Sequence, residues 1–132
     1  MSWQAILAIG SGGFLGAVLR AYLNGLISQK FPNLIIHGLP VGTLGVNLLG
    51  SFIMGLLFAY FLADTLLSSN VKSFLSTGIL GALTTYSTFA IESFILLHNS
   101  HYTLALTNMS LNLFGTILMA GLGFYLVTLI TK

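Results

Sequence analysis

The hydrophobic positions of this chain fall into four long apolar runs, separated by short polar linkers. The runs cover Trp3–Gln29, Val41–Ala63, Ser73–Leu97 and Thr103–Thr131. About 20 mostly apolar residues suffice for a helix to cross a bilayer, and each run is at least that long. The pattern predicts an all-α membrane protein with four transmembrane helices. We expect residues 1–132 to form one membrane domain with both termini on the same side.

Composition strengthens the membrane interpretation. Hydrophobic residues make up 56% of the chain and charged residues only 5%, and the mean hydropathy is +1.00. Four basic and two acidic side chains cannot solvate the surface of a 132-residue soluble domain. The net charge of +2 is too small and too scattered for a nucleic-acid surface. The chain has no cysteine, which excludes disulfides and thiolate metal sites.

The basic residues near the ends of the runs give almost no bias in orientation. Lys72 and Lys132 lie on one predicted side of the membrane. Lys30 lies on the other, and Arg20 sits in the half of the first run nearer to Lys30. Cytoplasmic loops normally carry the excess of Lys and Arg. This balance therefore fits either one orientation set by weak cues or insertion in both orientations.

Two stripes of polar side chains interrupt the apolar runs. The members of each stripe are four residues apart and share one helix face. They are Thr43, Asn47 and Ser51 in the second run, and Asn108, Asn112 and Thr116 in the fourth. Such residues often form hydrogen bonds between membrane helices. Because both runs start from the same membrane side, the stripes lie at matching depth, which favours a shared polar path.

Small residues recur at spacings that let helices approach closely. The first run contains a GxxxG pair, the third a similar small-residue pair, and the second three glycines. These residues are Gly12 and Gly16, Gly78 and Ala82, and Gly45, Gly50 and Gly55. The simplest interpretation is tight helix packing, which predicts a compact bundle and a narrow pore.

The centre of the third run carries five consecutive hydroxyl groups, from Thr84 to Thr88. Ser and Thr favour helix caps over helix interiors. We expect Gly81 to stop one helix over 73–80 and Ser87 to cap another over 87–97, with the break at the membrane midplane. Non-helical backbone at this depth occurs where it is buried in protein or lines a cavity. Freed carbonyls can hold a cation there, whereas N–H groups and hydroxyls can hold an anion.

An aromatic pair follows this expected break. Tyr86 and Phe89 are three residues apart and project in similar directions. The positive edges of aromatic rings can face a small anion without a full countercharge. For an aromatic pair taken alone, packing in the protein core is the commoner explanation.

Three motifs together resemble the Fluc-type (CrcB) fluoride channels. The string GALTTYSTFAIE is similar to the family's G-G-L-T-T-F-S-T-F-x-x-E signature. The string GTLGVNLLGSFIMG resembles its second-helix motif G-T-x-x-V-N-x-x-G-S-F, and GGFLGAVLRAY resembles its first-helix motif G-G-x-x-G-A-x-x-R-Y. The chain departs from these motifs at Tyr86, where phenylalanine is usual, at Ala82, which replaces a glycine, and at Ala21, which separates Arg20 from Tyr22.

The resemblance implies an antiparallel, dual-topology homodimer that passively exports fluoride across a bacterial cytoplasmic (inner) membrane. It implies a structural sodium ion at the dimer centre, bound by backbone carbonyls of Gly81 and Thr84 from both subunits. Asn47 would lie on the fluoride path, and Tyr86 and Phe89 would border it. The remaining implied path residues are Ser87, Thr88, Asn108, Asn112 and Thr116, and the implied membrane-embedded charges are Arg20 and Glu92.

Two other classes of function remain as alternatives. A small dual-topology, proton-coupled multidrug transporter is also a short four-span chain, but it needs a carboxylate in the substrate path, and Glu92 is the only spanning one. An intramembrane enzyme is less favoured. His37, His98 and His101 lie at the ends of the runs, and the chain has no HExxH spacing.

Overall fold

The computed structural model describes residues 1–33, 35, 37–63 and 66–131. Within these residues, four helical stretches are long and apolar enough to cross a membrane. They run over Trp3–Lys30, Val41–Ala63, Ser69–His98 and Tyr102–Ile130. The predicted four-helix arrangement is confirmed, with boundaries within a few residues of the apolar runs. Lys132, one of the basic residues used above to judge orientation, lies outside the described residues.

The first two stretches are each one uninterrupted helix. Helix α1 spans Trp3–Lys30, and its first turn is capped by the Ser2 hydroxyl, which accepts from the Ala5 N–H at 3.2 Å. Helix α2 spans Val41–Ala63, and its buried residues include the polar side chains of Thr43 and Asn47. The caps satisfy backbone groups that helix ends otherwise leave without partners.

The third and fourth stretches are built from several helical pieces. The third consists of α3 (Ser69–Ser73), the π-helical η1 (Phe74–Leu80), α4 (Gly81–Leu83) and α5 (Tyr86–His98). The fourth consists of α6 (Tyr102–Ser110), the π-helical η2 (Leu111–Gly115) and α7 (Thr116–Ile130). Nothing in the hydropathy pattern predicted the π-helical turns. Such turns widen the helix locally and often occur at functional sites.

The expected boundaries of the interruption in the third stretch are wrong. Gly81 has helical angles (φ −64°, ψ −32°), and the helix continues to Leu83. Thr84 and Thr85 then have extended backbone (ψ 150° and 113°), and α5 begins at Tyr86. The N-terminal cap is Thr85, whose hydroxyl accepts from the Thr88 N–H at 3.3 Å, and Ser87 lies inside the helix. A hydroxyl two residues earlier in the same run thus took the capping position.

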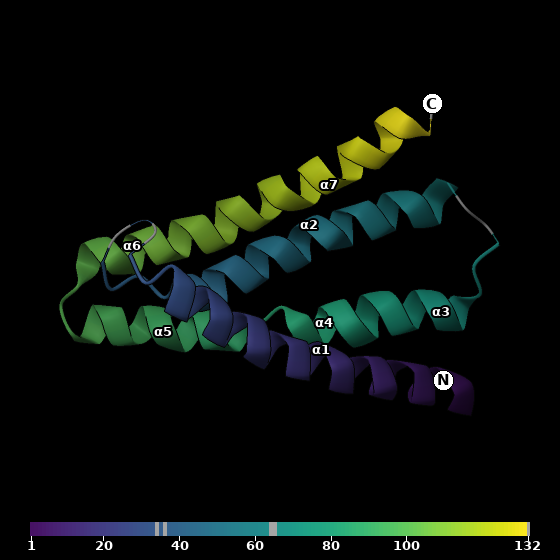
Figure 1. Ribbon diagram of the computed structural model, residues 1–132, viewed down its shortest axis with the longest axis horizontal. Coiled ribbons are helices and arrows are strands. Elements are labelled where there is room, and N and C mark those ends of the chain that lie inside the picture. The colour runs from purple at the N-terminus through teal and green to yellow at the C-terminus, as the bar shows by residue number, and fades with distance from the viewer. Residues whose placement is uncertain (34, 36, 64–65, 132) are drawn as a thin grey trace.

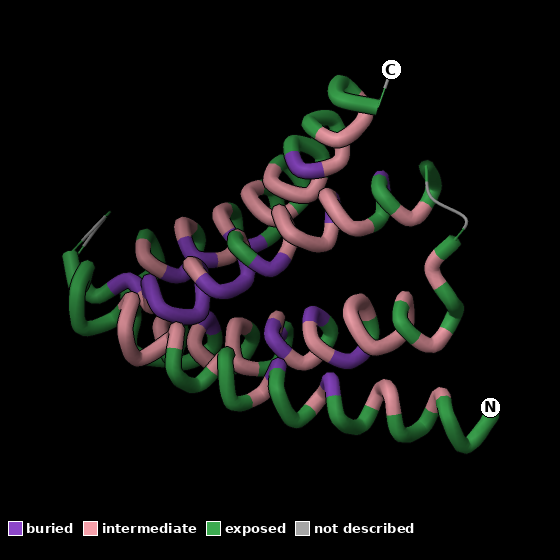
Figure 2. The backbone as a smooth tube through the Cα atoms, turned by 45° about the vertical axis from the view of Figure 1, so that its right-hand side comes forward, coloured by how far each residue is buried: buried purple, intermediate pink, exposed green. Residues whose placement is uncertain are grey.

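Figure 1 shows both chain termini at the same end of the bundle, as predicted. Helices α2 and α7 lie side by side along much of their length, and α1 packs against η1 and α4. Figure 2 shows buried residues concentrated along α2 and where the other helices meet it, with the outer faces exposed. Helix α2 is therefore the central element on which the site is built.

Glycines set the closest helix contacts. A Cβ on Gly16 of α1 would collide with the carbonyl oxygen of Ile79, and one on Gly12 would lie 2.5 Å from the Phe74 carbonyl oxygen. On the other side of the bundle, a Cβ on Gly55 of α2 would collide with the carbonyl oxygen of Ala120. These contacts confirm the close packing that the spacing of small residues predicted.

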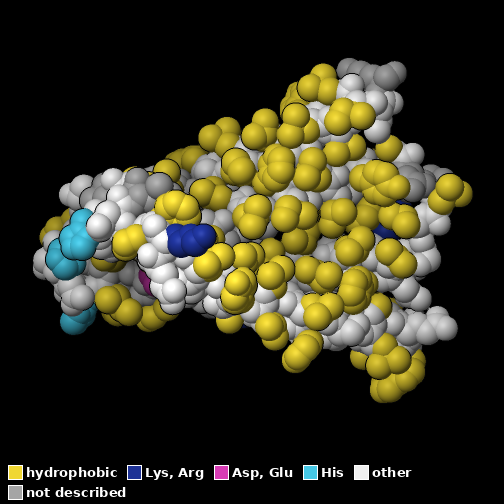
Figure 3. All heavy atoms as spheres, viewed as in Figure 1, with side chains coloured by type: hydrophobic (Ala, Val, Ile, Leu, Met, Phe, Trp, Pro, Cys, Tyr) yellow, Lys and Arg dark blue, Asp and Glu magenta, His cyan; other side chains and the backbone are white. Residues whose placement is uncertain are grey.

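The outer surface is apolar. Trp3, Phe14, Leu118 and Tyr125 are each about seventy per cent exposed, whereas Val46 of the core is only 1% exposed. Figure 3 shows hydrophobic side chains spread over the visible face of the bundle and histidines gathered at one end. A surface of this kind is suited to lipid rather than water, which supports a multi-pass membrane protein.

Candidate functional site

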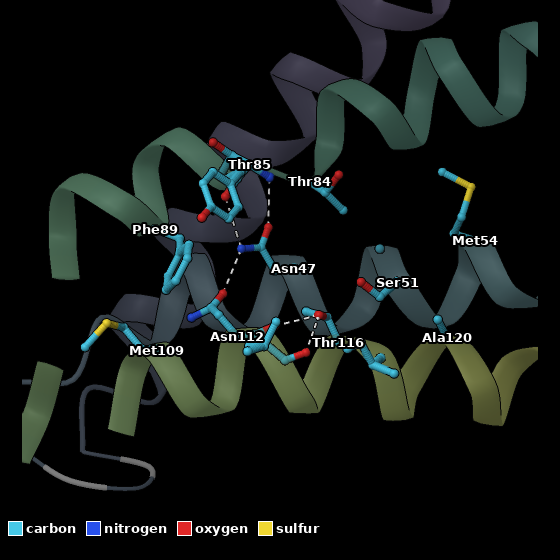
Figure 4. A pocket seen from close by; sticks show the side chains of 14 residues that line it. Asn47, Ser51, Met54, Thr84, Thr85, Phe89, Met109, Asn112, Thr116 and Ala120 are labelled. Carbon is cyan, nitrogen blue, oxygen red and sulfur yellow. Dashed lines mark hydrogen bonds between the residues drawn. The ribbon is translucent and has the colours of Figure 1, made fainter. Parts of the chain in front are cut away.

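The extended backbone at Thr84 and Thr85 is held by a side chain from another helix. The N–H of Thr85 donates to Asn47 Oδ1 at 2.8 Å, and Asn47 Nδ2 donates back to the carbonyl of Thr85 at 3.2 Å (Figure 4). In an unbroken helix, the Thr85 N–H would instead close a turn on the carbonyl of Gly81. Asn47 therefore pairs with both backbone polar groups of one residue, Thr85, and leaves the Gly81 carbonyl without this bond.

Asn47 also connects the second and fourth stretches. Its Nδ2 donates to Asn112 Oδ1 at 2.9 Å, and Asn112 Nδ2 donates to Asn108 Oδ1 and to the Asn108 carbonyl, both at 3.0 Å. All three amides are buried, at 7% exposure or less. The two polar stripes thus meet at Asn47 and Asn112. Thr43, the first member of the α2 stripe, faces other partners.

A cavity of about 540 Å³ opens beside this junction. Its walls come from α2, from the Thr84–Thr85 segment with the start of α5, and from α6, η2 and α7 (Figure 4). The polar wall consists of Asn47, Ser51, Thr84, Thr85, Asn112 and Thr116. The apolar wall consists of Gly50, Met54, Tyr86, Phe89, Met109, Leu113, Ile117 and Ala120. Every lining residue is uncharged, so an ion here would meet only dipoles, hydroxyls and rings.

The aromatic pair borders the cavity. The rings of Tyr86 and Phe89 are 5.3 Å apart between centroids and meet edge to face at 71°. Tyr86 is 79% exposed in the single chain, whereas Phe89 is half-buried. Both residues line the cavity, and Tyr86 also reaches the surface of the protomer.

Ser87 and Thr88 are not among the cavity-lining residues and belong to the cap of α5. The Thr85 hydroxyl lies 3.0 Å from that of Thr88 and 3.4 Å from that of Ser87. Three of the five hydroxyls in the run are thus engaged with one another. Thr84 donates its hydroxyl to the Leu80 carbonyl at 3.1 Å and closes the last turn of α4.

The buried end of Glu92 belongs to a second polar cluster between α1, α2 and α5. The Thr43 hydroxyl donates to Glu92 Oε1 at 2.6 Å, and Asn24 Nδ2 donates to Thr43 Oγ1 at 3.2 Å. Among the described residues, Glu92 Oε2 is buried without a hydrogen-bond partner. Arg20 lies one turn before Asn24 on α1 and is half-buried. Neither Arg20 nor Glu92 lines the cavity.

Gly81 lies on the exposed side of α4. A Cβ placed on it would have one neighbour within 4 Å among the described residues, the carbonyl oxygen of Ser76 at 3.5 Å. The space around Gly81 is therefore open in the single chain, unlike that around Gly16 or Gly55. Thr84, three residues on, is half-buried and lines the cavity.

Two polar residues of the site escaped the sequence reasoning. Ser93 of α5 is 5% exposed, accepts from Asn108 Nδ2 at 3.0 Å and donates to the Phe89 carbonyl at 2.8 Å. Asn24 of α1 bonds to Thr43 as described above. Ser93 has no polar residue four positions before or after it, whereas Asn24 lies four residues from both Arg20 and Ser28. The available signal was the occurrence of a polar side chain within an apolar run.

Comparison with known proteins identifies relatives over the whole chain. The family model for CrcB-like proteins, described as Camphor Resistance (CrcB), matches residues 7–124. A protein of Sulfurimonas denitrificans, named a fluoride-specific ion channel, is 70% identical over 129 residues, which is 98% of this chain and 97% of the relative. Relatives with the same name are 44% identical in Nautilia profundicola, over the full length of both chains, and 48% identical in Methanococcus maripaludis, over 91% of this chain and 93% of the relative.

Proposed function

This chain belongs to the CrcB-like family, and we propose on that premise that it is a fluoride-specific ion channel. Fluoride would cross passively and leave a bacterial cell across the cytoplasmic (inner) membrane, which lowers its cytoplasmic concentration. The observation that carries this function is 70% identity, over nearly the whole length, to a protein named for it. The four membrane-crossing helices and the uncharged cavity agree with a channel.

The cavity beside Asn47 forms part of the fluoride path. Fluoride is small and strongly hydrated, so a selective path must replace water with hydrogen-bond donors and exclude larger anions by its width. The polar wall offers the hydroxyl of Ser51, and the rings of Tyr86 and Phe89 offer positive edges. The hydroxyls of Thr84 and Thr116 line the same wall but donate to the carbonyls of Leu80 and Asn112. The absence of full charge from this lining keeps binding weak enough for the ion to leave.

The transporter alternative fits the site less well. A proton-coupled transporter needs a carboxylate where the substrate binds, but Glu92 lies outside the cavity lining and accepts from Thr43. Drug resistance that depends on Glu92 would be the signature of that alternative. A protein that passes fluoride but transports no drug would instead be a channel.

The working unit is an antiparallel homodimer with a sodium ion at its centre. Gly81 is exposed on the protomer surface, and its carbonyl is released because the Thr85 N–H is donated to Asn47. The extended backbone of Thr84 turns a second carbonyl out of the helix. Oxygen ligands of this kind suit a hard cation. Two copies in opposite orientations would bring both sets of carbonyls to one point at the midplane.

Reconstitution tests the function directly. Liposomes that contain the purified protein and are loaded with fluoride should release it when a potassium ionophore dissipates the membrane potential. Liposomes loaded with chloride should retain their anion. Protein-free liposomes give the background. Equal release of both anions, or none above background from correctly folded protein, would exclude a fluoride-specific channel.

Two further measurements test the assembly. Cross-linking between single cysteines placed at opposite ends of the bundle should join two copies if they are antiparallel. Anomalous scattering or sodium-23 signals should show a bound ion that disappears when the dimer is separated. Cross-links found exclusively between equivalent ends would exclude the antiparallel arrangement.

A further inference from the structure

The direction of one buried amide is fixed by the protein backbone. An amide side chain can normally turn over and exchange its oxygen with its nitrogen. Asn47 cannot, because its Oδ1 accepts from the N–H of Thr85 while its Nδ2 donates to the carbonyl of the same residue. A backbone N–H only donates and a carbonyl only accepts, so a single orientation satisfies both.

This orientation passes to the next amides in sequence. The remaining acceptor of Asn47 Nδ2 is Asn112 Oδ1, which turns Asn112 Nδ2 toward Asn108. Asn108 must then accept through Oδ1, which leaves its Nδ2 to donate to Ser93. Asn108 is fully buried at 0% exposure, so water cannot substitute for the partner. A reversal at any position would oppose two donors or two acceptors.

Ser93 is the last member of this series of hydrogen bonds, and it bonds to the helix segment that carries the aromatic pair. Its hydroxyl oxygen accepts from Asn108, so its single hydrogen is available for the carbonyl of Phe89, one turn earlier on α5. This series of hydrogen bonds thus starts at Thr85, the cap of α5, crosses α2 and the α6–η2 region, and returns to α5 at Phe89. The first turn of α5, which carries Tyr86 and Phe89, is held at both of its ends.

We propose that Ser93 is a positioning residue for the ion path, because it receives the last hydrogen of a one-way amide chain that starts at Thr85 and fixes Phe89. Ser93 itself does not line the cavity. Asn47 is also a positioning residue, since the two acceptors of its Nδ2 are both protein groups. The inference rests on the proposed fluoride path and adds how its wall is kept in one arrangement.

Three variants test this role by fluoride efflux from liposomes. Ser93→Ala leaves the Asn108 amide buried without an acceptor, and we expect fluoride flux to fall by about tenfold, the effect of one such orphaned donor on a rate. Ser93→Thr keeps the hydroxyl and should retain most of the flux. Ser11→Ala is the matched control, because Ser11 donates to the carbonyl four residues earlier at 2.7 Å but is exposed on α1.

A double variant separates positioning from packing. Ser93→Ala with Asn108→Leu removes the orphaned amide, while the Asn112 Nδ2 that donated to Asn108 Oδ1 retains the carbonyl of residue 108 as an acceptor. We expect the melting temperature to return toward that of the original protein while fluoride flux stays low. Recovery of flux together with stability, or native flux in Ser93→Ala alone, would overturn the proposal.

A measurement without fluoride keeps this test separate from the channel assignment. Side-chain amide hydrogens of Asn108 should exchange slowly with heavy water in the original protein and much faster in Ser93→Ala, as followed by NMR. If the original protein conducts no fluoride, the proposed function fails. The exchange comparison still shows whether Ser93 holds the Asn108 amide in place. Equal exchange in the two proteins would show that Ser93 does not hold the Asn108 amide.

Discussion

At the residue scale, side chains that line the same cavity make different kinds of interaction. Asn47 lines the cavity, yet its amide pairs with the backbone of Thr85 and with Asn112. Phe89 also lines it, and its ring makes an edge contact with Tyr86 rather than a hydrogen bond. A substitution at Asn47 disturbs the frame of the path, whereas one at Phe89 changes the surface that faces an ion.

Phe89→Ala tests the ring without touching the backbone. The carbonyl of residue 89 can still accept from Ser93, so the fold should persist, while loss of the ring edge should lower fluoride flux by about tenfold. Phe94→Ala on the same helix is the matched control, since Phe94 is 59% exposed and lies outside the cavity lining. Efflux assays on both variants measure the difference, and equal flux in the two would remove Phe89 from the path.

At the element scale, the helices are held at close distance by glycines and are offset by π-helical turns. Gly55 brings α2 against the backbone of α7 at Ala120. The turn η2 carries Asn112 and ends at Gly115, where a Cβ would lie 2.9 Å from the Leu48 side chain. The wider turn and the close helix contact together place Asn112 within reach of Asn47.

Gly55→Ala should separate α2 from α7. The added Cβ collides with a backbone carbonyl that cannot move away as a side chain could, so we expect a loss of about 1–3 kcal/mol in the free energy of unfolding. Gly121→Ala on α7 is the control, because a Cβ there has no described neighbour within 4 Å. Thermal unfolding in detergent compares them. A Gly55→Ala protein as stable as the control would show that the contact is not tight.

At the scale of the whole molecule, the single chain leaves its central surface uncovered. Tyr86 is mostly exposed, and Gly81 has open space beside it. An antiparallel partner would cover both and supply the second set of carbonyls for sodium. The nearly balanced basic residues agree with copies inserted in both directions, because neither side of the membrane carries a clear excess.

Gly81→Leu distinguishes a partner contact from an internal one. Since the nearest described atom to an added Cβ is 3.5 Å away, the protomer should fold with its usual helix content. The dimer should be lost, because the side chain occupies the surface where the copies meet, and bound sodium should be lost with it. Size-exclusion chromatography with light scattering measures assembly. An intact dimer with native flux would place the interface elsewhere.

Orientation can be forced by charge. Leu66→Lys with Leu67→Lys adds two cations to the loop between α2 and α3, and should bias insertion toward one direction. Fluoride resistance should disappear when this variant is expressed alone. It should return on co-expression with Phe31→Lys, Ile35→Lys, which adds the charges at the opposite end. Activity from a population shown to insert one way would refute the antiparallel dimer.

The hydropathy pattern predicted the four spans well because the thickness of a bilayer sets how long an apolar helix must be. The interruption was harder to position, since Gly81 is compatible with helical angles and the run holds four Ser and Thr residues that can each serve as a cap. The matching depth of the two polar stripes was predicted from their spacing, and Asn47 and Asn112 meet there.

Other parts of the site leave no comparable mark in the sequence. Ser93 is one serine within an apolar run, and its role depends on Asn108 from another helix. The π-helical turns depend on how helices pack rather than on a local residue pattern. Thr43 belongs to the α2 stripe by spacing, but the partners it faces are Asn24 and Glu92. The sequence thus predicts which residues share a face more readily than it predicts what that face meets.

The one-way amide chain gives each protomer a built-in electrical asymmetry. Each amide is a small dipole, and those of Asn47, Asn112 and Asn108 are linked in a fixed order. A membrane voltage of one sign would oppose this order, and the other would reinforce it. In an antiparallel pair the two chains run in opposite senses, so their asymmetries cancel. Currents through the dimer should then be equal at positive and negative voltage.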